Sequence, residues 1–150
     1  MRHSGTQKIE TSRLLLRPLL PEDAPMMFDN WASDPEVTRW LRWEPHTSPA
    51  ETRALLSAWA ELYPNPDYYQ WAMVEKASGQ VFGTISINRL SRLEMQSDLR
   101  PDDPQWEPGY CIGRAWWGQG YTTEALRAVV GHWFDTVQGE DLGCCHAAGN

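Results

Sequence analysis

Apolar side chains recur at two different spacings along the chain. Residues 11–18 hold a short apolar run that ends at a proline, and this pattern predicts a strand. Residues 48–62 begin with a capping box that has proline at the first helical position, and continue with apolar residues at helical spacing. They predict a helix, and the acidic residues that follow Pro21 and Pro35 predict two shorter helical segments before it.

The spacing changes to two in the middle of the chain. Large apolar side chains alternate with smaller or polar ones over residues 69–73, a turn sequence follows at 77–80, and residues 81–87 form a second strand-like run. Residues 68–88 therefore predict an antiparallel hairpin. Residues 89–105 combine prolines with charged side chains and predict an exposed connection, for which mobility is favoured over a contact with substrate.

A strand, a loop with glycines and a helix follow in that order. Residues 106–113 predict a strand with a bulge near Pro108-Gly109, and residues 114–120 predict the loop. The helix is predicted from one apolar stripe, which consists of Leu126, Val129, Val130, Trp133, Phe134 and Val137.

The composition is typical of a globular protein. The 150 residues are 41% hydrophobic and 22% charged, which fits one domain with a buried core and excludes a disordered tail, a collagen-like fibre or a charged coiled coil. The chain starts without the apolar stretch of a signal peptide, and no apolar run approaches the roughly 18 residues of a membrane span. We therefore expect a soluble, cytoplasmic protein.

The charge narrows the classes of partner. A formal net charge of −7 disfavours nucleic acid and anionic membranes, and it mildly favours a cationic amine. The three cysteines, at positions 111, 144 and 145, are too few for a disulfide framework. Because no Cys-x-x-Cys or His-x-x-His spacing occurs, we expect no metal site.

The order strand, glycine loop, helix can present unpaired backbone N–H groups at the positive end of a helix, where an anion binds. Gly118 and Gly120 allow the backbone to approach a ligand, and Thr122 and Thr123 add hydroxyl donors. A pyrophosphate fits this arrangement. The alternative is that Gly-Gln-Gly serves only as a tight entry into the helix. The loop lacks the P-loop pattern, and no acidic residue follows at the spacing of a dinucleotide-binding site.

Residues 116–125 resemble the acetyl-CoA signature of the GNAT superfamily of N-acetyltransferases, in its RimJ/RimL-like branch. Residues 10–17 and 81–85 are similar to the first and third strands of that branch. The resemblance implies an α+β fold, the acyl-CoA N-acyltransferase fold, with a mixed, mostly antiparallel sheet flanked by helices. Trp117 stands where the superfamily motif has Gln or Arg, and Thr122 stands at its final Gly or Ala position.

The same resemblance implies how acetyl-CoA would bind. Backbone amides of the loop and the first helical turn would hold the pyrophosphate, and the preceding strand would pair with the pantetheine arm. A donor N–H on that strand would face the thioester oxygen as an oxyanion donor. The implied acetyl-CoA residues are Tyr110, Cys111, Ile112, Trp117, Gly118, Gln119, Gly120, Tyr121, Thr122, Thr123 and Asn150.

An alkylammonium must lose its proton before its nitrogen attacks the thioester, so the reaction needs a base. Glu107 is the candidate, because it precedes the cofactor-contacting stretch on the same strand and the resembled family often has an acid in this region. The alternative is a solvent-facing glutamate at the start of a strand. Trp40 and Trp43, with His46 nearby, lie in the segment that walls the acceptor pocket in this superfamily; the competing interpretation is a homodimer interface.

Other reactive or aromatic residues are expected to be structural. Cys111 lacks a neighbouring histidine and is interpreted as a buried strand residue rather than a nucleophile. His132 is expected to pack, and Glu124 to turn away from a bound phosphate. Trp59, Trp71 and Trp133 are assigned to the core.

The end of the chain bears on both domain and function. We expect Gly139 to end the last helix and residues 143–147 to form another buried strand. Asn150 matches only the first residue of the pattern that opens a further helix and strand pair in the branch, so residues 1–150 are expected to form one C-terminally short domain. Either activity is weak or another copy covers the open edge.

The expected function is N-acetyl transfer from acetyl-CoA to a primary amine of a small molecule or a protein N-terminus, by direct attack in a ternary complex. The alternative is a catalytically weak or inactive acyl-CoA-binding or oligomeric scaffold protein, suggested by Thr122 and by the short C-terminal end.

Overall fold

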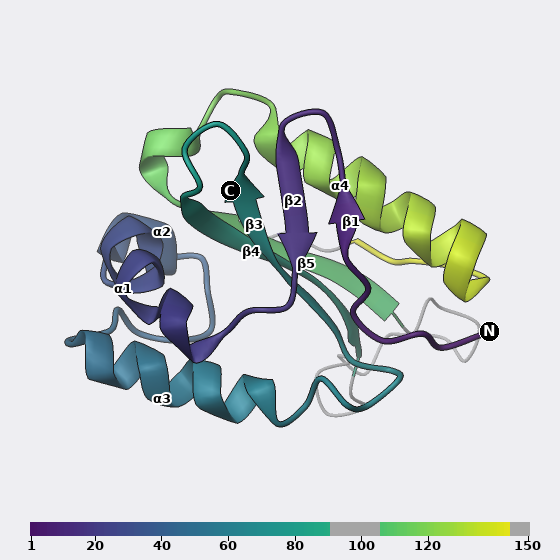
Figure 1. Ribbon diagram of the computed structural model, residues 1–150, viewed down its shortest axis with the longest axis horizontal. Coiled ribbons are helices and arrows are strands. Elements are labelled where there is room, and N and C mark those ends of the chain that lie inside the picture. The colour runs from purple at the N-terminus through teal and green to yellow at the C-terminus, as the bar shows by residue number, and fades with distance from the viewer. Residues whose placement is uncertain (91–105, 145–150) are drawn as a thin grey trace.

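The computed structural model describes residues 1–90 and 106–144, and folds them as an antiparallel sheet between two groups of helices (Figure 1). Each described strand pairs antiparallel with its neighbour, in the order β1-β2-β3-β4-β5. The α+β class expected from the sequence is confirmed. The strands are β1 (Ile9–Glu10), β2 (Leu14–Arg17), β3 (Tyr69–Glu75), β4 (Val81–Arg89) and β5 (Trp106–Ile112).

Helices flank the sheet on both faces, and none within the described residues is long and apolar enough to cross a membrane. One group precedes β3 in the chain, and the other follows β5. The first group is η1 (Pro21–Asp23), α1 (Ala24–Met27), η2 (Phe28–Ala32), α2 (Pro35–Thr38) and α3 (Pro49–Ala60). The second group is η3 (Arg114–Trp116), α4 (Tyr121–Gly131) and η4 (His132–Val137). Here η1 and η3 are 3-10 turns, whereas η2 and η4 are π-helical turns.

The start of α3 follows its sequence signal. The Ser48 hydroxyl accepts a hydrogen bond from the Glu51 N–H at 3.3 Å, as a helix N-cap does. The Glu51 carboxylate reaches back to the Thr47 N–H at 2.8 Å, so the return bond of the predicted capping box lies one residue earlier than expected.

The predicted hairpin is confirmed as β3 and β4, but the predicted bulge is in a different place. β4 pairs with β5 without a register shift, from Gly83 opposite Ile112 to Arg89 opposite Trp106. The prediction of a bulge near Pro108 is therefore wrong. The irregularity lies between Met73 and Val74, where β3 pairs with β4. β5 accommodates Pro108 because it lies at the edge of the described sheet, where an outward-facing position needs no ladder N–H.

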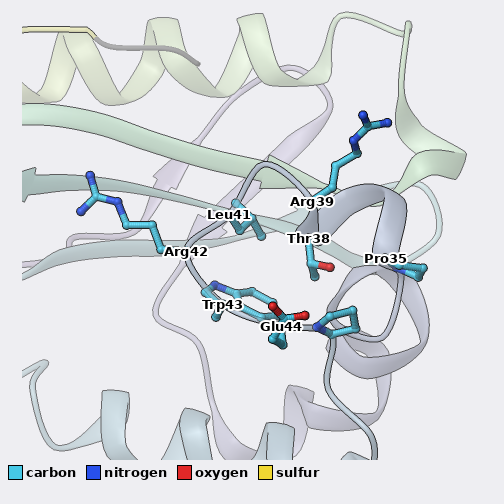
Figure 2. A pocket seen from close by; sticks show the side chains of 8 residues that line it. Pro35, Thr38, Arg39, Leu41, Arg42, Trp43 and Glu44 are labelled. Carbon is cyan, nitrogen blue, oxygen red and sulfur yellow. The ribbon is translucent and has the colours of Figure 1, made fainter. Parts of the chain in front are cut away.

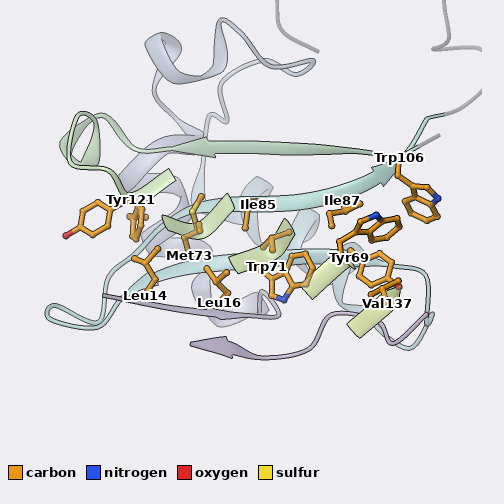
Figure 3. Close-up of a cluster of buried hydrophobic side chains, with 14 residues drawn as sticks. Leu14, Leu16, Tyr69, Trp71, Met73, Ile85, Ile87, Trp106, Tyr121 and Val137 are labelled. Atoms are coloured by element: carbon orange, nitrogen blue, oxygen red, sulfur yellow. The ribbon is translucent and has the colours of Figure 1, made fainter. Parts of the chain in front are cut away.

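Two hydrophobic clusters stabilise the fold, one on each face of the sheet. The cluster beneath α4 combines aliphatic and aromatic side chains, including Trp71 (Figure 3). Trp71 and Trp133 are fully buried in it, as expected. The second cluster joins the sheet to α1, η2, α2 and α3, and Trp59 is half-buried at its rim.

The buried face of α4 and η4 differs from the predicted stripe. Its fully buried positions recur every fourth residue. Phe134 was predicted to belong to the apolar stripe, but its side chain is 43% exposed, so that prediction is wrong. The residues that directly follow a buried position within α4, Leu126 and Val130, are only half-buried, and Phe134 follows buried Trp133 in the same way and faces outward. The buried positions are Tyr121, Ala125, Val129, Trp133 and Val137.

Gly139 is not the left-handed residue that ends the helix. Its lack of a side chain instead allows its backbone to pack closely against Trp133. Gln138 takes the left-handed conformation, with φ of 57°. The Gly139 N–H donates to the Trp133 carbonyl at 3.0 Å, and a Cβ at position 139 would overlap the Trp133 indole. Residues 91–105 of the predicted connection and residues 145–147 of the predicted last strand lie outside the described residues.

Tyr63 ties the segment after β2 to β3. Its hydroxyl accepts from the Leu19 N–H at 2.8 Å and donates to the Gln70 carbonyl at 3.1 Å. Burial raises the pKa of Tyr63 to about 12. Because the folded state disfavours the phenolate, its contribution to stability is complete below the ordinary phenol pKa of about 10 and falls as pH rises toward about 12.

We expect Tyr63→Phe to lower the free energy of unfolding at pH 7 by about 1–2 kcal/mol, since two backbone groups lose a partner. The variant should also lose less stability than the wild type when urea unfolding is compared at about pH 9 and about pH 11. An equal alkaline loss in both proteins would contradict this role of the Tyr63 phenol.

Candidate functional site

A cleft of about 980 Å³ lies beside β5 and brings together segments that are distant in the sequence. Its walls come from the segment after α2, the end of β4, β5 and the loop before α4. Expected site residues that line it are Trp40, Glu107, Tyr110, Cys111, Ile112, Trp117, Gly118 and Thr122.

Backbone groups of β5 alternate between β4 and the cleft. The Gly113 N–H donates to the Phe82 carbonyl at 2.8 Å, and pairing is regular from there to Trp106. In an antiparallel ladder the polar groups of successive residues point to opposite sides, so those of Tyr110 and Ile112 face away from β4. Those of Cys111 face β4, which removes its backbone from pairing with a ligand at the outer edge.

Two contacts confirm this alternation and occupy part of the edge. The Trp117 indole N–H donates to the Ile112 carbonyl at 2.9 Å, and the Gly143 N–H donates to the Trp106 carbonyl at 2.8 Å. Within β5, Pro108 has no N–H to offer. The outward-facing N–H groups that line the middle of the cleft are therefore those of Tyr110 and Ile112.

The loop before α4 has the backbone geometry expected of an anion site. Gly118 and Gly120 adopt φ of 72° and 80°, a region that favours glycine. The Glu124 N–H donates to the Gly120 carbonyl at 3.1 Å, so α4 begins at Tyr121 and the amides of its first turn precede any intrahelical bond. These N–H groups and the helix dipole favour a bound anion.

The remaining loop residues hold its shape. The Gln119 side chain donates to the Ala115 carbonyl at 2.9 Å. The hydroxyl of buried Tyr121 donates a hydrogen bond to the Glu75 carboxylate at 2.5 Å. Thr123 is exposed on the first turn. These side chains do not line the cleft, so Gln119, Gly120, Tyr121 and Thr123 remain candidates through their backbone. Asn150 lies outside the described residues.

Glu124 turns away from the cleft, as expected. Its carboxylate accepts hydrogen bonds from the Thr11 hydroxyl at 2.6 Å and from the Arg13 N–H at 2.9 Å, and pairs with the Arg13 guanidinium at 2.7 Å. Partial burial opposes ionisation, but these bonds outweigh it and hold the pKa of Glu124 below its ordinary value. An ionised carboxylate is thus kept away from the candidate anion site.

A row of polar side chains on β4 was missed at the sequence level. Thr84 and Ser86 are buried, and Asn88 donates to the Ser86 hydroxyl at 2.9 Å. Polar residues spaced by two are the signal that could have found the row, since alternate strand residues share a face. Across the ladder the row pairs Thr84 with Cys111, Ser86 with Gly109, and Asn88 with Glu107.

This row places Glu107 beside hydrogen-bonding groups at one end of the cleft. Asn88 and Glu107 both line the cleft and are direct cross-strand partners, so their side chains share a face of the sheet. Glu107 is half-buried. The loop amides at Gly118 lie toward the other end of β5, which leaves the strand edge between the candidate base and the anion site.

Trp40 and Trp43 have different surroundings. Trp40 is 42% exposed and lines the cleft. Trp43 lines a neighbouring hollow of about 480 Å³, where Figure 2 shows Arg39 and Arg42 projecting to opposite sides of the loop. The Trp43 ring lies 4.8 Å from that of His46, a buried residue whose Nδ1 is 2.7 Å from the Thr52 hydroxyl. Trp40 alone of the pair faces the cleft.

His132 packs as expected, whereas Cys111, expected to be buried, is half-buried and lines the cleft. Burial raises the pKa of the Cys111 thiol, whose sulfur lies 3.6 Å from the Thr84 hydroxyl, so the thiolate is disfavoured. His132 contacts Ser4 at 3.4 Å and packs edge-on against Trp71, and burial lowers its pKa. Neither geometry supplies an activated nucleophile.

The sequence matches a family model described as Acetyltransferase (GNAT) domain over residues 13–150. The chain belongs to the GNAT acetyltransferase family. It is 27% identical over 131 residues to a protein of Bacillus licheniformis named Uncharacterized N-acetyltransferase p20, covering 87% of this chain and 68% of that one.

Solved structures share the GNAT fold. A putative ribosomal-protein-serine acetyltransferase from Vibrio cholerae superposes with a TM-score of 0.77 at 21% identity, covering 98% of this chain and 78% of that one. The ribosomal-protein-S5-alanine acetyltransferase from Vibrio fischeri gives a TM-score of 0.74 at 16% identity, with 96% and 76% covered. These structures establish the fold of the GNAT domain.

Proposed function

We propose that this GNAT domain transfers an acetyl group from acetyl-CoA to a primary amine by direct attack in a ternary complex. One observation carries the proposal: the glycine loop, the outer edge of β5 and Glu107 all contribute to a single cleft. Acetyl-CoA would supply an activated thioester. The amine nitrogen would bond to its carbonyl carbon while the carbon–sulfur bond breaks, and coenzyme A would leave as a thiolate that takes up a proton to give the free thiol.

The cleft offers matching groups for each part of the cofactor. The backbone amides at Gly118, at Gly120 and in the first turn of α4 suit a pyrophosphate, because they combine unpaired donors with the positive end of a helix. The outward-facing N–H groups of Tyr110 and Ile112, with the Tyr110 carbonyl, suit the amides of the pantetheine arm, which would pair like an added strand. Trp117 forms a wall where these two regions meet.

Glu107 serves as the proton acceptor. An alkylammonium has a pKa of about 10, so the nitrogen must lose a proton before its lone pair can attack. The Glu107 carboxylate lies at the cleft beside Asn88 and takes this proton directly or through one water. The acceptor enters past Trp40, whose exposed face provides an apolar surface for it.

Isothermal titration calorimetry with acetyl-CoA, combined with a thiol-release assay over amine acceptors, tests the function. We expect binding, and release of one thiol for each amine acetylated. The acceptor panel covers peptide N-termini, amino acids, polyamines and aminoglycosides. Binding without release across the panel would favour the acyl-CoA-binding alternative, and absence of binding would contradict both.

The edge N–H of Tyr110 can be tested separately from its side chain. We expect Tyr110→Pro to raise the Kd for acetyl-CoA about tenfold, because the variant loses this N–H while the outer edge of the strand tolerates proline. Tyr110→Ala keeps the N–H and is the matched control, with an expected change of less than about threefold. Equal effects of the two substitutions, measured by calorimetry, would contradict main-chain pairing at this position.

A further inference from the structure

The turn between β1 and β2 lies against the first turn of α4, although more than one hundred residues separate them in the sequence (Figure 1). Arg13 lies in this turn and is absent from the lining of the cleft. Its guanidinium nevertheless contacts three residues at the glycine loop and the start of α4, none of which lines the cleft: Gln119, Tyr121 and Glu124.

The guanidinium makes three kinds of contact with the start of α4. Its Nε donates to the Glu124 carboxylate at 2.7 Å, and its Nη1 donates to the Gln119 carbonyl at 2.9 Å. Its Cζ lies 4.2 Å from the centre of the Tyr121 ring, within the range of a cation–π interaction. A planar guanidinium meets these requirements together because its donors have fixed directions.

The bond to Gln119 determines which way the next amide points. Across a planar trans peptide, the carbonyl of one residue and the N–H of the next point in opposite directions. Since the Gln119 carbonyl is held toward Arg13, the Gly120 N–H is directed away from it. The guanidinium also lies next to Gly120, since an added Cβ there would be in ordinary van der Waals contact with the Arg13 Nη2, at 3.5 Å.

The turn that carries Arg13 is itself fixed to the sheet. The Lys76 N–H donates to the Arg13 carbonyl at 2.9 Å, and the Lys76 ammonium donates to the Thr11 carbonyl at 2.7 Å. The Thr11 hydroxyl also bonds Glu124 at 2.6 Å. Arg13 therefore connects an anchored strand end to the loop, and movement of the loop would break several charge-assisted bonds.

We propose that Arg13 is a positioning residue for the phosphate-binding loop, which it holds with the Gly120 amide directed away from the β1–β2 turn and toward bound cofactor. This inference rests on the proposed binding of acetyl-CoA at that loop. An amide that is oriented before binding costs no ordering when the anion arrives, so the effect of Arg13 appears in cofactor affinity.

Calorimetric titration of acetyl-CoA into the wild type and into R13Q tests the proposal. We expect the Kd to rise about tenfold in R13Q, in line with the loss of charge-assisted bonds that orient the loop. At saturating acetyl-CoA, kcat should stay within about twofold of wild type, so that the change appears in the KM for the cofactor. R13K keeps the positive charge but lacks the planar set of guanidinium donors. It should still bind acetyl-CoA at least about fivefold more weakly than wild type.

R17Q is the matched control. Arg17 forms a comparable paired contact with Asp23, at 2.8 and 2.9 Å, on the other end of β2. The R17Q variant should have a lower free energy of unfolding than wild type, and its Kd for acetyl-CoA should stay within about twofold of wild type. If R13Q does not fold, E124Q serves in its place. It removes the negative charge that strengthens the hydrogen bond from the Arg13 Nε, and it should raise the Kd for acetyl-CoA about threefold.

The outcomes separate this proposal from the proposed function. A wild-type protein that does not bind acetyl-CoA would overturn the proposed function, and this proposal with it. A wild type that binds, with an R13Q or R13K variant of equal affinity, would overturn the role of Arg13 alone. Equal weakening by R13Q and R17Q would assign the effect to general destabilisation and would also overturn it.

Discussion

Glu107→Gln is expected to lower kcat at least about a hundredfold, because the glutamine amide cannot accept the proton that the substrate ammonium must lose. The side chain keeps its size and its place beside Asn88, so the Kd for acetyl-CoA should stay within about twofold of wild type. Initial rates over a range of pH, at saturating acetyl-CoA, provide the measurement. The variant should recover activity as the pH approaches the pKa of the free amine.

A second carboxylate provides the control for this prediction. Glu44 is exposed at the rim of the neighbouring hollow, and Glu44→Gln removes the same charge close to the cleft. We expect its kcat to remain within about twofold of wild type. A Glu107→Gln enzyme with a wild-type pH–rate profile, or a Glu44→Gln enzyme with an equal loss, would exclude Glu107 as the base.

Gly83→Ala is expected to destabilise the sheet beside the cleft by about 2–3 kcal/mol, since an added Cβ has no space there. It would collide with the Cys111 carbonyl and lie 2.6 Å from the Ile112 Cγ2 on β5. β5 must then shift away from β4, and its outer edge moves with it. We expect thermal unfolding to show a Tm about 5–10 °C lower, together with weaker binding of acetyl-CoA.

Gly79→Ala is the matched glycine substitution. Gly79 adopts φ of 72° in the turn of the hairpin, and no atom lies within 4 Å of an added Cβ. Its cost is the backbone strain of the left-handed region, about 1 kcal/mol. A Gly83→Ala protein no less stable than Gly79→Ala would contradict the close approach of β4 and β5 at this position.

Local signals in the sequence predicted the elements that depend on neighbouring residues. Ser48 and Pro49 marked the start of α3, alternation over residues 69–73 marked β3, and the glycines at 118 and 120 marked the loop. Each of these features arises from contacts within a few residues. The bulge between Met73 and Val74 depends instead on the register of two strands, and no local pattern specifies it.

The parts of the site that the sequence could not predict depend on contacts between distant segments. The bonds from Thr11 and Arg13 to Glu124 join positions more than one hundred residues apart. The burial of Ala125 and the exposure of Phe134 follow from the path of α4 and η4 across the sheet, which the apolar spacing along the chain does not specify. The sequence also could not show that the backbone groups of Cys111 face β4 while those of Tyr110 and Ile112 face the cleft. That direction depends on the pairing of Cys111 with Thr84 on β4.

An NMR titration of isotopically labelled protein with acetyl-CoA tests the central claim most directly, because it reports on each backbone amide. We expect the largest shifts at the Tyr110 and Ile112 amides along β5, and at the amides of Gly118, Gly120 and Thr122 in the loop and first turn of α4. Shifts confined to other surfaces, or no shifts at saturating acetyl-CoA, would contradict the placement of the cofactor in this cleft.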